Sequence, residues 1–222
     1  MKLLIITQTV DEGDQLLGFF ISWIKLFAGK FEKITILCLN EGGHSLPPNV
    51  GVVCLGKNRG KSKLRQFFNF QFSIFNLRND YDAVFVHMNP IWVVLGGPFW
   101  RLANKKIFFW YTHKSVTPKL KIAEKLADVI FTASKESFRL PSRNLIVTGH
   151  GIDTNFFKPD PTNDQQQTTN NLRLLSVGRI SPVKNYETLI GAAKLLKDEG
   201  TDFSVTMVGE AALKKMRIMN CE

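Results

Sequence analysis

Cysteine is scarce in this 222-residue sequence, which contains only Cys38, Cys54 and Cys221. The three are far apart and none belongs to a CxxC pair, so neither a disulfide framework nor a zinc ribbon is expected. Cys38 and Cys54 fall inside strand patterns, where a free thiol behaves as a small apolar side chain. These features predict a chain that folds in a reducing compartment.

A long uninterrupted hydrophobic run is also missing. The longest apolar stretch, residues 90–100, is interrupted by Gly96, Gly97 and Pro98. It is shorter than the ~20 residues that a membrane-spanning helix needs. Residues 1–7 are followed too soon by Asp11 and Glu12 to be a secretory signal. The sequence therefore predicts a cytoplasmic protein.

Acidic residues are fewer than basic ones. The chain has 29 Lys and Arg against 19 Asp and Glu, and residues 1–160 hold 21 of the former and 12 of the latter. This excess suggests an anionic partner, such as nucleic acid, a phosphorylated substrate or an acidic membrane, with mere solubility as the alternative. No recognised nucleic-acid motif accompanies it, and no GxGxxG follows the first strand pattern. Both observations argue against a nucleic-acid binder and a nicotinamide dehydrogenase.

What is present is a regular alternation of apolar strand patterns and amphipathic helix patterns. Several strands are apolar throughout, which indicates a parallel sheet covered on both faces. The predicted fold class is α/β with a Rossmann-like parallel sheet. We expect helices at 14–29, with Asp14 as its cap, and at 62–77, and strands at 3–7, 33–39, 50–55, 83–86, 106–111, 129–133 and 145–147.

A domain boundary is expected at residues 158–171, which contain no apolar residue that could pack into a core. This polar linker separates an N-terminal domain, 1–157, from a second strand–helix–strand unit, 172–222. Strands at 173–177 and 203–208 flank a helix at 184–197. Complete domains of this kind usually need about 100 residues, so the second is expected to be incomplete and the chain a fragment.

The turn between the first strand and the helix of that second unit has the features of a phosphate site. Gly178 permits a tight turn, Ser181 can cap the helix, and Pro182 suits its first position. Arg179 and Lys184 add two cations beside a helix N-terminus, whose free N–H groups already attract anions. Two fixed charges suit a diphosphate, although an ordinary turn with two solvated cations is the alternative.

Three segments resemble the retaining glycosyltransferases of family 4, which have the GT-B architecture of two Rossmann-like domains. Residues 145–159, LIVTGHGIDTNFFKP, are similar to the family's NG(V/I)D…F.P crossover into the second domain. Residues 174–190 resemble its VGR…K(G/N)…LI donor-phosphate segment, and His113 lies where family members keep an active-site histidine. The resemblance covers essentially residues 1–209.

This resemblance implies transfer of a sugar from a nucleotide-diphosphate-sugar donor to a glycan or lipid-linked acceptor, with retention, in polysaccharide biosynthesis. It implies no cofactor and no metal, because protein cations neutralise the departing diphosphate. It assigns catalysis to His113, Arg179 and Lys184. It assigns binding of the donor phosphates to Gly178, Arg179, Lys184 and Asn185. Their places in the predicted fold add His87, His150 and Asp11 as further candidates for substrate binding.

The residue patterns alone leave alternatives for several of these. His113 and His87 end strands at the carboxyl edge, where open α/β sheets bind ligands. The alternative for His113 is a histidine that caps the next helix or is solvated, and for His87 a loop histidine with its hydrogen bonds satisfied. His150 could contact substrate or act in a hinge. Asp11 could bind acceptor hydroxyls or compensate the charge of a helix N-terminus.

A basic, aromatic segment at 57–78 suggests a second interaction. Such a helix can lie on an anionic membrane and bring the site to a lipid-linked acceptor. The alternative is an inner helix with Leu64, Phe67, Phe68 and Phe75 in the core. The cations are Lys57, Arg59, Lys61, Lys63 and Arg65, and the aromatic residues are Phe67, Phe68, Phe70, Phe72 and Phe75.

The sequence also departs from the family. The pair of glutamates, seven residues apart, that holds the donor sugar is missing, and Gly209-Glu210-Ala211 stands where the family often has Gly-x-Gly. The loop at 8–14 lacks the family's frequent Gly-Gly. A non-catalytic binding module that cannot hold a donor is therefore the second hypothesis.

Overall fold

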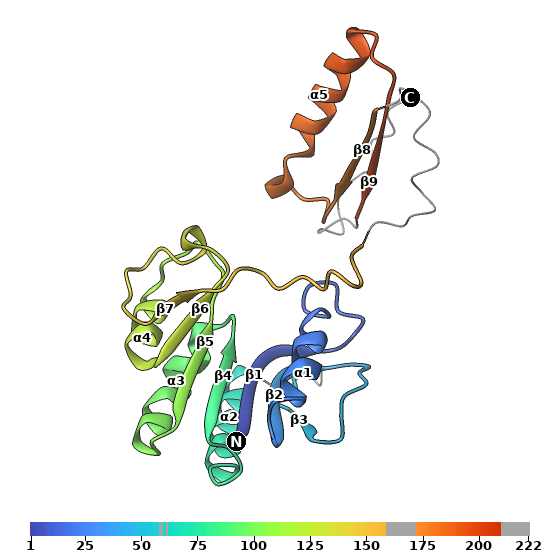
Figure 1. Cartoon of the computed structure of the whole chain (residues 1–222). Helices are drawn as coiled ribbons and strands as arrows, with labels where there is room; N and C mark the ends of the chain where they lie inside the picture. Colours follow the sequence, from blue (N-terminus) through green and yellow to red (C-terminus); the bar gives the residue numbers. More distant parts are fainter. Residues whose placement is uncertain (58–59, 61, 159–171, 210–222) are drawn as a thin grey trace. The chain divides into compact units, whose positions relative to one another are not determined.

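The computed structural model describes residues 1–57, 60, 62–158 and 172–209. The chain divides into two compact units, which we call unit 1 (Met1–Gly151) and unit 2 (from Ile152) (Figure 1). The linker expected at 158–171 lies, after Lys158, outside the described residues, as does the tail from 210 onward. Each unit is described by itself.

Unit 1 is built on a seven-stranded sheet in which every pairing is parallel. The strand order is β3-β2-β1-β4-β5-β6-β7, so the order reverses between β1 and β4. The parallel α/β sheet predicted from the apolar strand patterns is confirmed. The strands are β1 (Lys2–Val10), β2 (Lys33–Glu41), β3 (Val50–Cys54), β4 (Ala83–His87), β5 (Lys106–Trp110), β6 (Val129–Thr132) and β7 (Leu145–Val147).

Helices connect these strands across both faces of the sheet. Three of them begin at side-chain caps, where Ser62, Asn89 and Thr117 accept hydrogen bonds from backbone N–H groups of the first turn. Among the described residues, no helix is long and apolar enough to cross a membrane. The helices are α1 (Phe20–Ala28), α2 (Lys63–Asn76), α3 (Pro90–Leu102) and α4 (Pro118–Leu126), with a short 3-10 helix, η1, at Lys135–Ser137.

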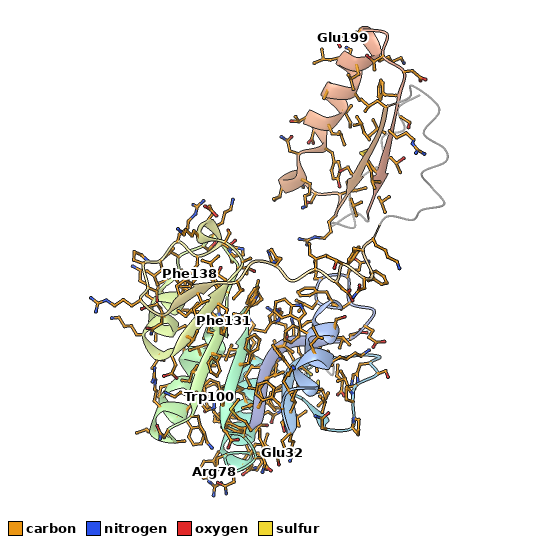
Figure 2. All side chains as sticks on the ribbon, in the orientation of Figure 1. Glu32, Arg78, Trp100, Phe131, Phe138 and Glu199 are labelled. Carbon is orange, nitrogen blue, oxygen red and sulfur yellow. The ribbon has the colours of Figure 1, made fainter. Side chains whose placement is uncertain are left out.

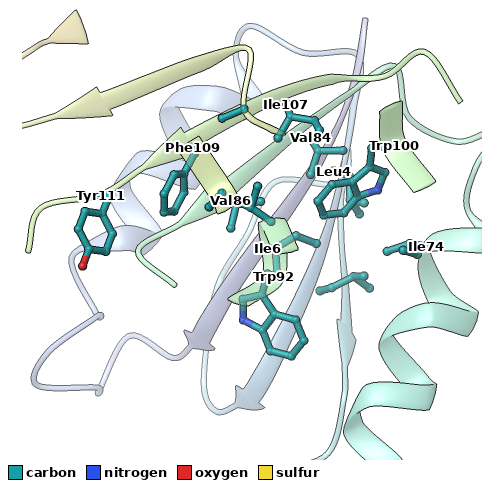
Figure 3. Packing of buried hydrophobic residues seen from close by; sticks show 14 of the residues in the cluster. Leu4, Ile6, Ile74, Val84, Val86, Trp92, Trp100, Ile107, Phe109 and Tyr111 are labelled. Atoms are coloured by element: carbon teal, nitrogen blue, oxygen red, sulfur yellow. The ribbon is translucent and has the colours of Figure 1, made fainter. Parts of the chain in front are cut away.

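The sheet carries a separate hydrophobic layer on each face. Side chains alternate along β1, so Leu4 and Ile6 face α2, α3 and α4, whereas Leu3 and Ile5 face α1. Trp100 of α3 lies fully buried in the first layer, among the side chains that Figure 3 shows and that Figure 2 places within unit 1. Its indole Nε1 donates a hydrogen bond to the Tyr81 hydroxyl at 3.1 Å. The Tyr81 hydroxyl in turn donates to the Ile74 carbonyl at 3.0 Å.

Two sequence expectations about helices in unit 1 were wrong in detail. The helix expected at 14–29 begins only at Phe20, because the chain first coils through Gly18, where a side chain would collide with backbone oxygens of Glu12 and Asp14. Asp14 caps that turn, with Oδ1 accepting from the N–H groups of Leu16 and Leu17.

The second correction concerns α2. It packs on the sheet through Phe70 and Ile74. Leu64, Phe68 and Phe75, which the alternative interpretation placed in the core, are exposed.

Unit 2 contains a parallel pair of strands, β8 (Leu172–Val177) and β9 (Phe203–Val208), connected by α5 (Tyr186–Asp198). The expected strand–helix–strand order is present, but the helix starts later than residue 184. A 3-10 turn, η3 (Pro182–Lys184), is followed by Asn185 in the left-handed region at φ 51°, and the helix proper begins after it. Ser181 makes no side-chain capping bond.

Candidate functional site

The predicted site residues fall in both units. Asp11, His87, His113 and His150 belong to unit 1, and Gly178, Arg179, Lys184 and Asn185 belong to unit 2. In unit 1, His87 ends β4, and the other three follow β1, β5 and β7 at the carboxyl edge of the sheet. Ligands of open α/β sheets bind outside this edge, at the point where the strand order reverses. That point lies between β1 and β4.

His87 stands at that reversal as the last residue of β4. Its ring is buried, and Nδ1 lies 3.2 Å from the Thr7 hydroxyl oxygen on β1. Nε2 is buried and has no hydrogen-bond partner among the described residues. Burial lowers the pKa of His87 to about 4, because the charged ring would lose its hydration. The imidazole is therefore neutral at physiological pH.

Aromatic side chains enclose the His87 ring. Phe20 of α1 stacks on it with ring centroids 4.0 Å apart and an interplanar angle of 4°. Phe19 and Trp23 approach it at 6.3 and 6.2 Å. Because the enclosing groups are apolar, Nε2 is a polar atom held in a low-dielectric setting, where a hydrogen bond to a ligand would be strong.

The backbone after His87 is tightly constrained. Met88 has a positive φ of 67°, and the Asn89 N–H donates to the His87 carbonyl at 2.9 Å, which closes a three-residue γ-turn. The Met88 N–H in turn donates to the Trp110 carbonyl on β5 at 2.8 Å. A non-glycine residue in this conformation is costly and is found preferentially at functional sites.

Asp11 already has a structural task. Its Oδ1 accepts from the Gly13 N–H at 3.0 Å, and its carboxylate lies directly against Gly42, in the loop after β2. Neighbouring Glu12 accepts from Lys25 Nζ at 3.0 Å, and chiefly this bond holds the pKa of the Glu12 carboxyl below its usual range. The acidic cluster thus ties the loops after β1 and β2 together.

His113 is exposed in the loop after β5. Its Nδ1 accepts from the Ser115 N–H at 3.2 Å, which leaves the proton of the neutral ring on Nε2. Tyr111 braces this loop, because its hydroxyl donates to the Ser115 carbonyl at 2.9 Å. The helix that follows is capped by Thr117, so His113 does not cap it.

His150 is exposed, with its ring 6.4 Å from that of Trp110. Trp110 is the register partner of His87 on the neighbouring strand, and its ring also lies 4.9 Å from that of Trp23, which approaches His87. His113 joins this group only through its position on the same edge of the sheet.

The α1 face of unit 1 also holds a hollow of about 490 Å³. Its walls include Trp23, Phe85, Phe108, Trp110 and Phe131, and its lining is almost entirely apolar. A sugar or phosphate needs polar partners to be oriented, so this hollow does not supply a site for a nucleotide sugar.

In unit 2 the turn after β8 places a cation beside a glycine. The Lys184 ammonium lies 3.8 Å from where a side chain on Gly178 would begin. The Tyr186 hydroxyl donates to the Gly178 carbonyl at 2.9 Å and fixes the turn. Gly209, directly after β9, packs against the same carbonyl oxygen so closely that no larger residue fits there.

Arg179 and Lys184 are both exposed, and neither forms an ion pair with a carboxylate in the part of the chain that the structure describes. Their charges are therefore available to an anion. The sequence predicted that the N–H groups of a helix beginning at 182–184 would add to these charges. In the structure those residues form η3, and Asn185 in the left-handed region separates it from α5. The first free N–H groups of α5 thus come after Lys184.

No three His, Cys, Asp or Glu side chains of the described residues lie close enough together to hold a metal ion. Sequence reasoning missed Thr7, Phe20, Tyr186 and the γ-turn at Met88. None of them belongs to a motif with fixed spacing, and each acts through a contact that only the fold creates. Gly209 was noted in the sequence, but its packing against Gly178 was not foreseen.

No family model and no curated protein matches the sequence. Solved structures do share the fold. HepE of Anabaena in complex with UDP-glucose superposes with a TM-score of 0.67 at 18% identity, covering 97% of this chain and 62% of HepE. The lipopolysaccharide outer core galactosyltransferase WaaB gives 0.64 at 14% identity, with 96% and 62% covered. The UDP-GlcNAc 2-epimerase of Methanocaldococcus jannaschii gives 0.53 at 13%, with 93% and 65% covered.

At these identities the likeness establishes the fold, the Rossmann-like α/β architecture of GT-B proteins. The chain spans about three fifths of the length of HepE and WaaB. Its structural neighbours thus include glycosyltransferases.

Proposed function

We propose that the chain acts in a nucleotide-sugar-dependent glycosyltransferase of the retaining, family 4 type, and transfers a sugar to a glycan or lipid-linked acceptor. The observation that carries this proposal is the Lys184 ammonium beside Gly178, unpaired within the described residues, at the carboxyl end of β8. A solved protein with the same fold binds UDP-glucose, whose diphosphate is the group that such a turn would hold.

The chemistry follows from the charges. As the bond between the anomeric carbon and the diphosphate breaks, its electron pair leaves with the phosphoryl oxygen. The acceptor oxygen forms the new glycosidic bond, and its hydroxyl proton passes to the departing diphosphate oxygen. The fixed cations Arg179 and Lys184 favour the transition state, because negative charge grows on the leaving oxygen at that moment. No metal or cofactor is part of this proposal.

Unit 1 contributes the sugar-facing groups in this proposal. The exposed Nε2–H of His113 donates to a substrate hydroxyl, and the neutral His87 orients the reacting groups through Nε2, which no described residue engages. His150 is a further substrate contact of unit 1, whereas Gly178 and Asn185 belong to the phosphate turn of unit 2. Asp11, which lies against Gly42, keeps the loops after β1 and β2 in contact at this edge of the sheet.

The test measures binding and transfer separately with the purified chain. Isothermal titration with UDP and with UDP-glucose is expected to show binding that weakens when Arg179 is replaced by Gln. Release of UDP in the presence of an oligosaccharide or lipid-linked acceptor reports transfer, and the anomeric coupling constant of the product by NMR reports retention. Inversion at the anomeric carbon would contradict the retaining assignment.

Two further hypotheses give different results in the same assays. An epimerase is considered because UDP-GlcNAc 2-epimerases share the fold. It would change the configuration of the UDP-sugar without releasing UDP. A non-catalytic binding module would bind an acceptor glycan but neither bind UDP-glucose nor turn it over.

A further inference from the structure

Helix α2 leaves a stripe of large apolar side chains in solvent. Leu64, Phe68, Phe72 and Phe75 are 65, 59, 69 and 53% exposed. We call these four residues the α2 stripe. The Phe75 ring also contacts Phe99 of α3, with centroids 6.1 Å apart. Contiguous apolar surface of this kind usually marks an interaction site.

The stripe is one continuous face of the helix. At 3.6 residues per turn, positions 64, 68, 72 and 75 fall within a sector of about 80°. The helix packs on the sheet through a different face, that of Phe70 and Ile74. The fold of unit 1 therefore does not need the stripe, and the 14 residues of α2 form a two-sided helix about 21 Å long.

The charge around the stripe has a single sign. Residues 42–79 contain six Lys and Arg and no Asp or Glu. Lys57, Lys63 and Arg65 lie toward the start of α2. Arg78, which Figure 2 labels, follows its end. All four are exposed and pair with no carboxylate among the described residues. The Arg78 guanidinium lies 4.6 Å from the centroid of the Phe75 ring.

We propose that the α2 stripe binds an anionic lipid surface, with the phenylalanine rings among the acyl chains and the flanking cations on lipid phosphates. Apolar side chains bordered by Lys and Arg, with no acid between them, match the layered chemistry of such a surface. A second copy of the chain fits less well, because pairing two stripes would bring two sets of cations together. The proposal does not depend on the proposed sugar transfer.

Vesicle sedimentation with the full chain tests it. The chain is expected to sediment with phosphatidylglycerol/phosphatidylcholine vesicles at low salt, and at least tenfold more weakly with phosphatidylcholine alone. The double variant Phe68→Ser, Phe72→Ser is expected to weaken binding at least tenfold, because it removes two rings that would be buried among the acyl chains. The matched control is Leu26→Ser with Leu102→Ser, two residues that are 72 and 90% exposed on other helices, and it should leave binding unchanged.

The charges are tested by Lys63→Gln with Arg65→Gln. Each lost cation is expected to weaken binding about fivefold, so the pair about 25-fold. Lys119→Gln with Lys121→Gln removes the same charge from exposed positions at α4 and serves as control. This arm gives a result even if the serine variants fail to fold, which circular dichroism and thermal melting would reveal.

Three outcomes would overturn the proposal: equal binding to neutral vesicles, equal losses in the control variants, or gel filtration showing a dimer that Phe72→Ser dissociates. Competition by a single-stranded RNA that is insensitive to Phe68→Ser and Phe72→Ser would point to a nucleic-acid surface instead. None of these results depends on donor binding, so failure here and failure of the proposed transfer are distinguishable.

Discussion

The Nδ1 atom of His87 lies 3.2 Å from the hydroxyl oxygen of Thr7, and this contact joins β4 to β1 where the strand order of the sheet reverses. One of the two ring nitrogens, Nδ1, therefore forms a hydrogen bond within unit 1. The other is enclosed by aromatic rings and has no partner among the described residues. Such a histidine links the stability of unit 1 to pH.

We predict that stability falls as the pH drops from about 6.5 toward 4. An unfolded imidazole has a pKa near 6.5, whereas burial lowers that of His87 to about 4, so the unfolded chain binds the proton first. The full shift corresponds to about 3 kcal/mol of unfolding free energy, all of it present above pH 7. Urea titrations between pH 7.5 and 4 should lose this component in His87→Phe and keep it in His113→Gln. An unchanged pH profile in His87→Phe would contradict the prediction.

Replacing Lys184 by Gln should weaken the binding of UDP about tenfold or more, because a fixed charge next to the diphosphate is lost. If the chain transfers sugar, turnover should fall by the equivalent of about 2–4 kcal/mol in transition-state stabilisation. Lys197→Gln, an equal change at the other end of α5, should leave both unchanged. Equal affinity of the Lys184 variant and the unmodified chain in titration calorimetry would contradict the proposed phosphate site.

The two glycines at the end of the β8–β9 pair should differ in their tolerance of a methyl group. At Gly178 the added carbon would meet Lys184 and Tyr186 at ordinary contact distances, whereas at Gly209 it would collide with the Gly178 carbonyl oxygen. Gly209→Ala should therefore destabilise unit 2 by about 1–3 kcal/mol and Gly178→Ala by much less. Hydrogen exchange of the amides of β8 and β9 measures the difference, and similar exchange in both variants would show the prediction to be wrong.

Removing the Tyr81 hydroxyl should cost about 1–3 kcal/mol, because the buried Nε1 of Trp100 would lose its only hydrogen-bond partner among the described residues. Trp100→Phe in the same background removes the orphaned donor, so the double variant should cost less than the sum of the single ones. Chemical denaturation of the four proteins gives this coupling. Burial of the Tyr81 hydroxyl also raises its pKa to about 12, which spectrophotometric titration can check.

Much of the fold follows from local sequence patterns. Strands β1 and β4 contain uninterrupted apolar runs, at 3–6 and 83–86, and a parallel sheet buried on both faces accounts for that composition. The start of α1 was not predictable in the same way. Its apolar spacing continues back to Leu16, and only the close packing of Gly18 on the preceding backbone shows why the helix begins at Phe20.

The site was predictable only as a set of candidates. Strand-end position selected His87 and His113 equally, but their environments differ because Phe20 and Thr7 enclose one and solvent surrounds the other. The turn with Arg179 and Lys184 was identified from its residue types. The left-handed Asn185 that interrupts its helix start depends on backbone geometry, which residue spacing does not encode.

The pairing of β8 with β9 has a practical consequence. Within the described residues these strands pair only with each other, so each presents a free row of amide and carbonyl groups, and Leu175 and Val177 face solvent beside one of them. Residues 161–222 carry almost no net charge, with eight Lys and Arg against seven Asp and Glu. When unit 2 is expressed without the strongly cationic unit 1, its free strand edges should pair between molecules and cause β-aggregation. In the whole chain, the positive charge of unit 1 would thus keep unit 2 in solution.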